Sequence, residues 1–212
     1  YANWVRSAEK IAYDSATTNP VNIGTGDAFG IEFSIEKKYT TPKTKFYGWA
    51  NYSLSSSNRQ KYGYSYPYRF EQLQTLNLVL NYRLNESFEF STRFNYASNF
   101  PVTSPVGITP RLIGDSIAVN PFTRDVIFNL DFGGNENLNA DKKPAYHRLD
   151  LRGTYYTNFW STDWAFYIDI INVYNRQNVL GYDYYLDDDL IVRKENVGMI
   201  PLLPTFGINA RF

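Results

Sequence analysis

The sequence predicts an all-β fold, namely the wall of an antiparallel transmembrane β-barrel with about eight strands present. Three observations predict it. Long stretches alternate apolar and polar residues with a period of two, which is the strand period. The connections between these stretches are alternately very short and very long. Aromatic residues make up 18% of the 212 residues, and many of them fall close to the expected strand ends.

The alternation is clearest between Arg69 and Leu84. There, Leu76, Leu78 and Leu80 fall on one parity, opposite polar residues such as Asn77. A less regular stretch at the beginning of the chain is included as a first strand. In chain order, we expect strands over residues 2–11, 29–39, 46–54, 69–84, 88–99, 146–155, 164–174 and 202–212.

The connections predict which end of each strand lies on which side of a membrane. Those near residues 40–43, 85–86 and 158–162 have the size of hairpin turns. Those at 12–23, 59–67, 100–144 and 176–198 are much longer and rich in Asn, Asp, Pro and Gly. Short turns in the periplasm and long loops outside are typical of outer-membrane barrels.

A soluble β-sandwich also alternates, so strand length and aromatic placement have to decide between the two. Globular strands average about five or six residues, whereas these stretches alternate over roughly 11 to 16, enough to cross a bilayer at a tilt. The aromatic residues near the short turns predict a girdle at the membrane interface. They are Tyr39, Phe46, Tyr82, Phe88, Tyr155, Trp164 and Phe212.

Composition excludes several classes of function. The 21 basic and 21 acidic residues balance, which argues against nucleic-acid binding. The absence of Cys removes zinc thiolates, disulfides and cysteine nucleophiles. The mean hydropathy is −0.42, and no apolar run is long enough for a transmembrane helix. Because the chain starts at Tyr1 without an initiator Met, we expect a processed protein or a segment of a longer one.

Several segments resemble one family. They are Lys-Pro-Ala-Tyr-His-Arg-Leu-Asp-Leu-Arg at 143–152, Tyr-Ile-Asp-Ile-Ile-Asn-Val-Tyr-Asn-Arg-Gln-Asn at 167–178, Gly-Asp-Ala-Phe-Gly-Ile-Glu at 26–32, Asn-Tyr-Ser-Leu at 51–54, and Phe-Pro-Val-Thr-Ser-Pro-Val-Gly at 100–107. In order and spacing these resemble the carboxy-terminal barrel of TonB-dependent outer-membrane receptors of the Bacteroidota type. The final residues resemble the terminal strand signature of outer-membrane proteins, which implies that Phe212 is the signal read by the barrel-assembly machinery.

This resemblance implies a transport function. Residues 1–212 would be about the last third of a 22-stranded barrel in the outer membrane, without the plug domain and the TonB-binding segment that family members also have. The family takes up large or scarce nutrients, such as glycans, peptides or metal chelates, with energy from the inner-membrane proton gradient. The implied partners are outer-membrane lipid, the protein's own plug domain, the TonB complex, the barrel-assembly machinery and a surface lipoprotein. Neither a cofactor nor an enzymatic activity is implied.

The polar parity supplies the residues expected to face the lumen and the plug. They are Glu32, Glu36, Arg69, Glu71, Arg83, Glu89, Arg93, Arg148, Asp150, Arg152 and Arg211. Their mixed signs suit hydrogen bonding to a plug better than selection of one ion. The alternative for each of them is cross-strand charge pairing within the wall.

Other residues have side chains suited to binding or catalysis. Tyrosines in or beside the long loops are candidates for stacking on a ligand, or for an outer girdle: Tyr62, Tyr64, Tyr66, Tyr182, Tyr184 and Tyr185. Oxygen side chains at Asn135, Asn137, Asn139 and Asp141, and the run 187–189, could bind calcium but lack EF-hand spacing, so solvated loops are favoured. His147 is the only imidazole, and without a convergent nucleophile we expect a wall residue rather than a catalytic base.

Two rival functions remain at this point. A complete eight-stranded barrel, with both ends in the periplasm, could serve as a structural anchor or adhesin. The many bulky inward charges and a loop of roughly 45 residues fit a large receptor better than so narrow a barrel. An outer-membrane enzyme is the third possibility.

Overall fold

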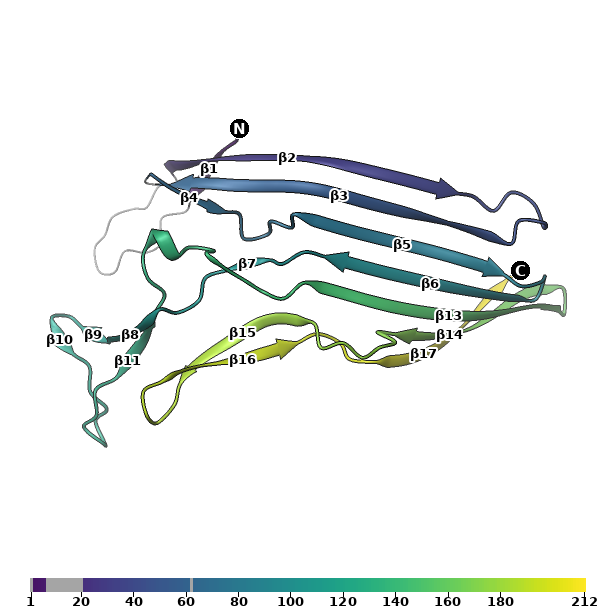
Figure 1. Ribbon diagram of the computed structural model, residues 1–212. Helices are drawn as coiled ribbons and strands as arrows, with labels where there is room; N and C mark the ends of the chain where they lie inside the picture. The colour runs from purple at the N-terminus through teal and green to yellow at the C-terminus, as the bar shows by residue number, and fades with distance from the viewer. Residues whose placement is uncertain (1, 7–20, 62) are drawn as a thin grey trace.

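The computed structural model describes residues 2–6, 21–61 and 63–212, with side chains described from residue 24 onward. The fold is all-β and antiparallel, with a single short 3₁₀ helix, η1 (Asn135–Asn137), in the described part. Eight strands form one continuous meander in the order β1-β2-β3-β5-β6-β13-β14-β17, and β4 adds to β3 beyond the end of β5. These eight strands lie side by side and run nearly parallel to one axis (Figure 1).

Most strands of this main sheet are long, and β1 and β4 are the short ones. The strands are β1 (Ala2–Arg6), β2 (Val21–Lys37), β3 (Phe46–Lys61), β4 (Tyr64–Pro67), β5 (Gln74–Arg83), β6 (Phe88–Ala97), β13 (Tyr146–Phe159), β14 (Thr162–Ile171) and β17 (Leu203–Arg211). Each predicted strand therefore has a counterpart in the same order. Of the predicted first strand, residues 2–6 are described and 7–11 lie outside the described residues.

The long connections contain strands that the sequence analysis assigned to loops. They are β7 (Pro101–Val102), β8 (Gly107–Pro110), β9 (Leu112–Ile113), β10 (Ser116–Ile117), β11 (Phe128–Asp131), β12 (Asp141–Lys142), β15 (Val179–Leu186) and β16 (Val192–Gly198). The connections expected at 59–67 and 12–23 were also drawn too long, because β3 and β4 occupy most of the first and β2 begins at Val21 within the second. The largest addition is the hairpin of β15 and β16. It gathers with β8 to β11 at the end of the sheet opposite the short hairpin turns (Figure 1).

The start of β5 corrects one predicted boundary. The alternation suggested a strand from Arg69, but β5 begins at Gln74. Before it, the backbone N–H of Glu71 donates to the carbonyl of Tyr68, and the N–H of Ser55 on β3 donates to the carbonyl of Leu73. Residues 68–73 therefore turn the chain rather than extend the strand, and apolar residues alone did not reveal this turn.

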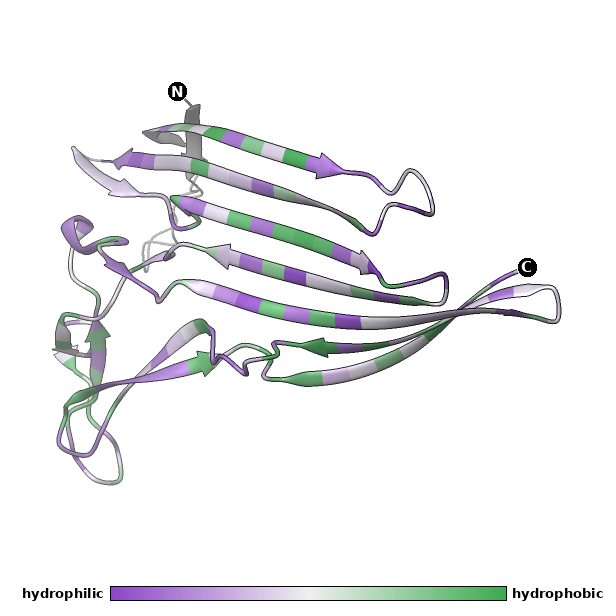
Figure 2. Ribbon diagram, turned by 45° about the vertical axis from the view of Figure 1, so that its right-hand side comes forward, coloured by the Kyte–Doolittle hydropathy of each residue, from purple (hydrophilic) through white to green (hydrophobic). Residues whose placement is uncertain are grey.

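The main sheet is a single layer without a conventional core. Leaving Gly and Pro aside, Ala118 is the only apolar residue that is buried among those the structure describes. One face of the sheet leaves large apolar side chains open, with exposed fractions of 60% at Phe33, 72% at Ile35 and 85% at Phe206. We call this the apolar face. The alternation along each strand is visible as green and purple bands in Figure 2.

Aromatic side chains pair on the apolar face close to the short turns, and we call them the aromatic band. Phe46 stacks on Tyr82 with ring centroids 4.6 Å apart, and Phe88 lies 5.0 Å from Tyr155. Phe159 and Trp164 stack at 4.8 Å across the hairpin of β13 and β14. Register explains these contacts, because Phe46 is the direct partner of Tyr82 and Phe88 that of Tyr155.

Tyr39, which was grouped with these aromatics on sequence, lies elsewhere. It follows the end of β2, and its ring is 5.4 Å from that of Tyr47. It also lies 5.4 Å from the guanidinium of Arg83. Tyr47 and Arg83 belong to the opposite parity, so Tyr39 packs on the polar side of the sheet.

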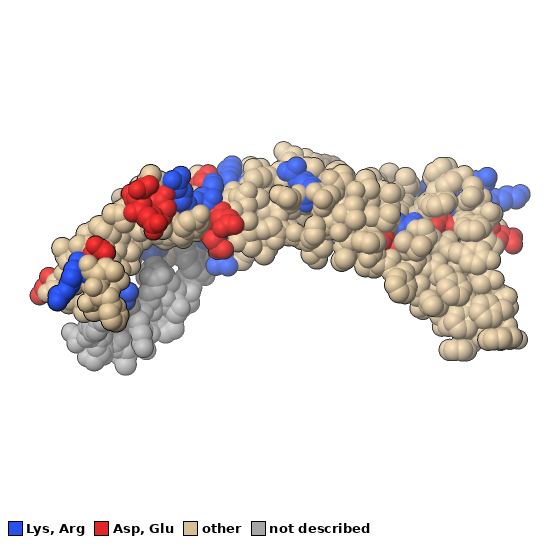
Figure 3. Space-filling model, turned by 90° about the horizontal axis from the view of Figure 1, so that it is seen from below, with Lys and Arg blue, Asp and Glu red and all other residues tan. Residues whose placement is uncertain are grey.

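The described part of the chain has no helix long and apolar enough to span a bilayer. Seen from the β17 side, the sheet is arched along its strands (Figure 3). Charged side chains gather toward its two ends and along one margin in this view.

Candidate functional site

The second face of the sheet is polar, and cross-strand register arranges its side chains in rows. One row runs through Ser34, Asn51, Asn77, Asn95 and Arg148. Because direct cross-strand partners share a face, every row on this parity lies on the same side. We call this side the polar face, and it is the candidate functional site.

Short polar side chains on this face bond to one another across strands. The hydroxyl of Ser34 donates to Asn51 Oδ1 at 2.6 Å, and Asn95 Nδ2 donates to Asn77 Oδ1 at 2.6 Å. In a neighbouring row the Ser91 hydroxyl donates to Asn81 Oδ1 at 2.7 Å. These bonds satisfy the polar groups within the sheet itself, which lets the face remain polar without a bound partner.

Nearer the short turns, the carboxylate of Glu89 is the centre of a buried network. Glu89 has an exposed fraction of only 6%. Its Oε2 accepts the Tyr47 hydroxyl at 2.6 Å and lies 3.7 Å from an Arg83 nitrogen. The Tyr156 hydroxyl is 3.3 Å from Oε1, and the Arg83 guanidinium lies 4.9 Å from the Tyr156 ring centroid. A buried carboxylate needs such partners, so this network fixes four strands together.

A second network ties β13, β14 and β17 together. Arg152 donates to both oxygens of Asp169, at 2.5 and 2.8 Å, and its guanidinium lies 4.3 Å from the Tyr167 ring centroid. The Tyr167 ring covers Gly207 on β17, where a Cβ atom would collide with it. The bidentate geometry and the stacking are characteristic of arginine and would be lost with lysine.

Residues of the polar face line several hollows, including one in mid-sheet and one at the short turns that Trp164 of the apolar face also lines. The first, of about 530 Å³, is lined by residues that include Trp49, Arg93, Arg148 and Asp150. The second, of about 760 Å³, lies among Arg83, Tyr156, Asp163, Asn209 and Arg211.

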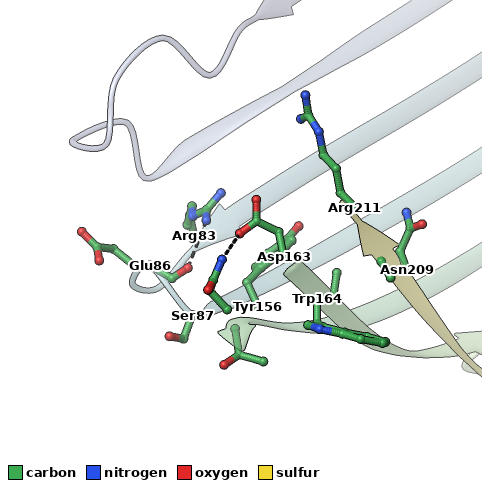
Figure 4. Close-up of a pocket in the computed structure, with 12 residues that line it drawn as sticks. Arg83, Glu86, Ser87, Tyr156, Asp163, Trp164, Asn209 and Arg211 are labelled. Atoms are coloured by element: carbon green, nitrogen blue, oxygen red, sulfur yellow. Dashed lines mark hydrogen bonds between the residues drawn. The ribbon is translucent and has the colours of Figure 1, made fainter. Parts of the chain in front are cut away.

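Figure 4 shows this turn-side hollow, with Arg211 extending from β17 apart from the other labelled side chains. Asn158 Nδ2 donates to Asp163 Oδ1 at 2.7 Å, although Asp163 is the register partner of Arg211. The indole Nε1 of Trp164, which also lines the hollow, is buried without a hydrogen-bond partner in the described structure.

The structure gathers most of the predicted lumen-facing residues on the polar face. Those on its strands are Glu32, Glu36, Arg83, Glu89, Arg93, Arg148, Asp150, Arg152 and Arg211. Arg69 and Glu71 instead lie in the turn before β5. The Arg69 guanidinium lies 4.4 Å from the Phe70 ring centroid. Glu71 is 8% exposed and accepts the Ser57 backbone N–H at 2.8 Å, so it is part of the turn's own hydrogen bonding.

The loop tyrosines divide by their contacts. Tyr184 is held in the loop assembly, because its hydroxyl is 3.0 Å from the Ser104 hydroxyl and its ring packs edge-on to Phe132. Tyr182 lies beneath the Lys194 ammonium, 4.3 Å from its ring centroid. Tyr64 and Tyr185 are 46% and 50% exposed. Tyr66 pairs with Arg59 in the ladder of β3 and β4 and is half-buried, and Tyr62 lies outside the described residues.

The oxygen-rich segment around η1 uses several of its polar groups to shape the long loop. Asn137 Nδ2 donates to the Ser104 carbonyl at 2.7 Å, and Asn139 Nδ2 to the Pro67 carbonyl at 2.9 Å. Asp141 accepts the Ser104 hydroxyl at 2.6 Å, and this bond, ahead of that from the Lys142 N–H, lowers the pKa of Asp141. In the described structure no three acidic, His or Cys side chains converge on a metal-sized site.

The acidic run 187–189 likewise forms a turn. Asp187 accepts the Ile191 backbone N–H at 2.8 Å and the Arg193 guanidinium at 2.6 Å. The bond from Ile191, the largest cause, and the Arg193 contact lower the pKa of Asp187. These oxygens therefore close the tip of the hairpin of β15 and β16.

His147 lies where β13 extends past its pairing with β14. Its Nδ1 is 2.8 Å from the Tyr174 hydroxyl, and its described contacts include no Ser, Thr or carboxylate that would make a catalytic triad. The backbone of His147, by contrast, has a specific hydrogen-bond partner. Its N–H donates to Asn178 Oδ1 at 3.1 Å, and its carbonyl accepts Asn178 Nδ2 at 2.9 Å. The Asn178 amide thus imitates the peptide of a neighbouring strand.

Two asparagines that the sequence analysis did not select are among the most buried residues of the structure. Asn172 is 0% and Asn178 is 3% exposed. Asn172 Nδ2 donates to the carbonyls of Arg176 and Ile200, and its own backbone N–H donates to Asp150 Oδ1. Arg176 donates to the Ala145 carbonyl and to Asn178. We call Asn172, Arg176 and Asn178 the asparagine knot. Its side chains supply hydrogen bonds to the backbone beyond the end of β14, where no neighbouring strand of the described residues does so. The knot thereby fixes the position at which β15 begins.

Comparison with known proteins adds no relative to this description: no protein-family model matches the chain, and no curated protein matches it significantly.

Proposed function

We propose that this chain is part of the barrel wall of a TonB-dependent outer-membrane receptor, which takes up a large or scarce nutrient such as a glycan, peptide or metal chelate. The observation that carries the proposal is the single-layer sheet with one open apolar face and one hydrogen-bonded polar face. Burying one large apolar side chain is worth about 1.5 to 3 kcal/mol. A face with so many of them requires an apolar environment, and lipid against one side of a sheet provides it.

The ends of the strands support an orientation. The hairpins at 84–87 and 160–161 are short, whereas the connections at 98–145 and 172–202 are long and packed together. The aromatic band lies at the short-turn end, where amphipathic rings favour a membrane interface. We place these turns in the periplasm and the hairpin of β15 and β16 outside the cell.

The open form of the sheet supports a wall rather than a complete small barrel. In the described residues β1 and β17 are the two ends of the strand path and do not pair. Because no backbone edge can be left unpaired in lipid, further strands are needed on both sides. This favours a large barrel of the 22-stranded kind, with a plug against the polar face, over an eight-stranded anchor.

Cysteine labelling in whole cells tests the orientation. This chain has no Cys, so Asp188→Cys, at the tip of the β15–β16 hairpin, and Lys43→Cys, in a turn connection, introduce single thiols. A membrane-impermeant maleimide should label the first in intact cells and the second only after the outer membrane is permeabilised. Equal labelling of both in intact cells would contradict the proposal.

Deletion of the TonB-binding segment from the full-length protein tests the transport function. Uptake of fluorescent glycan or peptide probes should be lost, while their binding at the cell surface should persist. Uptake that survives the deletion would rule out TonB-driven transport. Loss of both binding and uptake, in a protein still correctly inserted, would also count against it.

A further inference from the structure

The mid-sheet hollow of the polar face has an excess of positive charge. Three guanidinium groups line it, those of Arg93, Arg148 and Arg152, against the two carboxylates of Asp150 and Asp169. The hollow has a volume of about 530 Å³. It is bounded on one side by Trp49, which lies in the same cross-strand row as Arg93.

Both carboxylates in the hollow are already engaged. Arg148 donates through Nε and an Nη to one oxygen of Asp150, at 3.1 and 2.9 Å, and the other oxygen accepts the Asn172 backbone N–H at 2.9 Å. Asp169 holds Arg152 through both of its oxygens.

Arg93 is the remaining cation. It is the register partner of Asp150, yet its side chain forms no hydrogen bond or ion pair with any residue that the structure describes. In the same row Glu36 is separated from Arg93 by β3 and β5, and it pairs with Lys38 at 3.8 Å. Arg93 is exposed on the polar face, so its donors point to whatever occupies that side of the wall.

We propose that Arg93 and this hollow form a carboxylate-binding site. A guanidinium presents parallel N–H groups that match a carboxylate bidentately, as Arg152 already does with Asp169. The flanking pairs are neutral overall, so an incoming carboxylate meets one uncompensated positive charge. Trp49 and Val79, which share the cross-strand row of Arg93, form an apolar side of the hollow beside the guanidinium.

This inference rests on the proposed function, since it takes the polar face as the lumen side. The carboxylate could then come from an acidic side chain of the protein's own plug, or from an acidic nutrient passing the wall. The chemistry of the site is the same for both, and the two sources are separated by experiment.

The first experiment modifies arginines in the full-length, detergent-purified protein with p-hydroxyphenylglyoxal and quantifies each site by mass spectrometry. Arg211 is the internal reference, because it too is exposed and has no ion pair in the described structure. Succinate serves as the soluble carboxylate probe. A plug carboxylate predicts that Arg93 reacts about tenfold more slowly than Arg211 without succinate, the factor for one charge-assisted hydrogen bond. An open site predicts equal rates, and protection of Arg93 by succinate to a similar extent.

Equal reactivity of Arg93 and Arg211, both with and without succinate, would overturn the proposal. Arg93 would also react slowly if the plug shielded it from the reagent without binding it. Two variants distinguish shielding from an ion pair. In the plug-occupied case Arg93→Gln should speed proteolysis of the plug about tenfold, while Arg93→Lys, which keeps the charge, should stay closer to wild type. If both variants match wild type, the plug only shields Arg93 and the proposal is wrong.

In the open-site case, succinate should raise the thermal midpoint of wild type and of Arg93→Lys but not that of Arg93→Gln. A succinate shift that persists in Arg93→Gln would place the site elsewhere. None of these measurements depends on the labelling positions or the uptake assay that test the proposed function. The two proposals can therefore fail separately.

Discussion

The two faces of the same sheet are stabilised in different ways, one by bonds within the protein and the other by its surroundings. On the polar face the side chains bond to one another, as in the Glu89 network and the pair of Arg152 and Asp169. On the apolar face Ile35 and Phe206 are left open, so their contribution depends on what surrounds the protein. Strand parity alone separates the two, because neighbouring residues of one strand point to opposite sides.

The largest expected effect comes from placing a charge on the apolar face. Ile35→Arg should destabilise the full-length protein in lipid vesicles by about 2 to 4 kcal/mol, the cost of arginine near the bilayer centre. The measurement is equilibrium unfolding by guanidinium chloride. The matched control is Ser34→Arg on the polar face, which loses the bond to Asn51 at a cost of about 1 kcal/mol. Equal losses in the free energy of unfolding for the two variants would contradict the claim that only one face lies against lipid.

At the loop end of the sheet, the asparagine knot also satisfies polar groups by hydrogen bonds within the protein. Asn172→Ala leaves the carbonyls of Arg176 and Ile200 and the N–H of Arg176 without their partner. We expect a loss of about 2 to 3 kcal/mol, since buried unsatisfied groups cost about 1 to 3 kcal/mol each and partial rearrangement is available. The exposed Asn196→Ala is the control and should change stability little. A knot variant as stable as this control would mean that solvent replaces the lost bonds.

A smaller effect is expected for an ion pair at the open side of the polar face. The Arg152 side chain is 46% exposed, so screening by solvent limits its pair with Asp169 to about 1 kcal/mol. A double-mutant cycle of Arg152→Gln and Asp169→Asn should return a coupling energy of that size. Coupling of several kcal/mol would instead indicate that this face is dry.

The smallest effect concerns the long loop that contains Asp141 and depends on pH. Because the Ser104 hydroxyl lowers the pKa of Asp141 below its ordinary value of 3.8, the ionised carboxylate stabilises the loop at pH above that value. This contribution is lost as the pH falls through the lowered pKa. Limited proteolysis of the loop should therefore accelerate toward pH 3 more in wild type than in Asp141→Asn. A variant with the same pH profile as wild type would contradict the assignment.

Parity made the sheet predictable from the sequence. Leu76, Leu78 and Leu80 carry a period-two signal that needs no knowledge of distant residues, and the order of the strands followed from it. The hairpin of β15 and β16 was missed, although Tyr182, Tyr184 and Leu186 alternate. The Asp and Asn residues beside them suggested a loop.

The candidate site was predictable only in part, because its bonds join residues far apart in the chain. Asn178 resembles an ordinary loop residue, and only the position of the His147 backbone, 31 residues earlier, shows that it replaces a strand. Arg93 and Arg152 are equivalent by parity. The structure distinguishes them, since Arg152 pairs with Asp169, whereas the Arg93 side chain pairs with no carboxylate of the described residues.

The most direct test of the two-faced wall is the environment of consecutive residues on β2. Nitroxide labels placed singly at residues 32 to 36 of the protein in vesicles report collisions with oxygen, which is enriched in lipid, and with a water-soluble nickel chelate. We predict oxygen maxima at Phe33 and Ile35 and nickel maxima at Glu32, Ser34 and Glu36. If nickel reaches all five positions equally, the apolar face is not in lipid and the central claim is wrong.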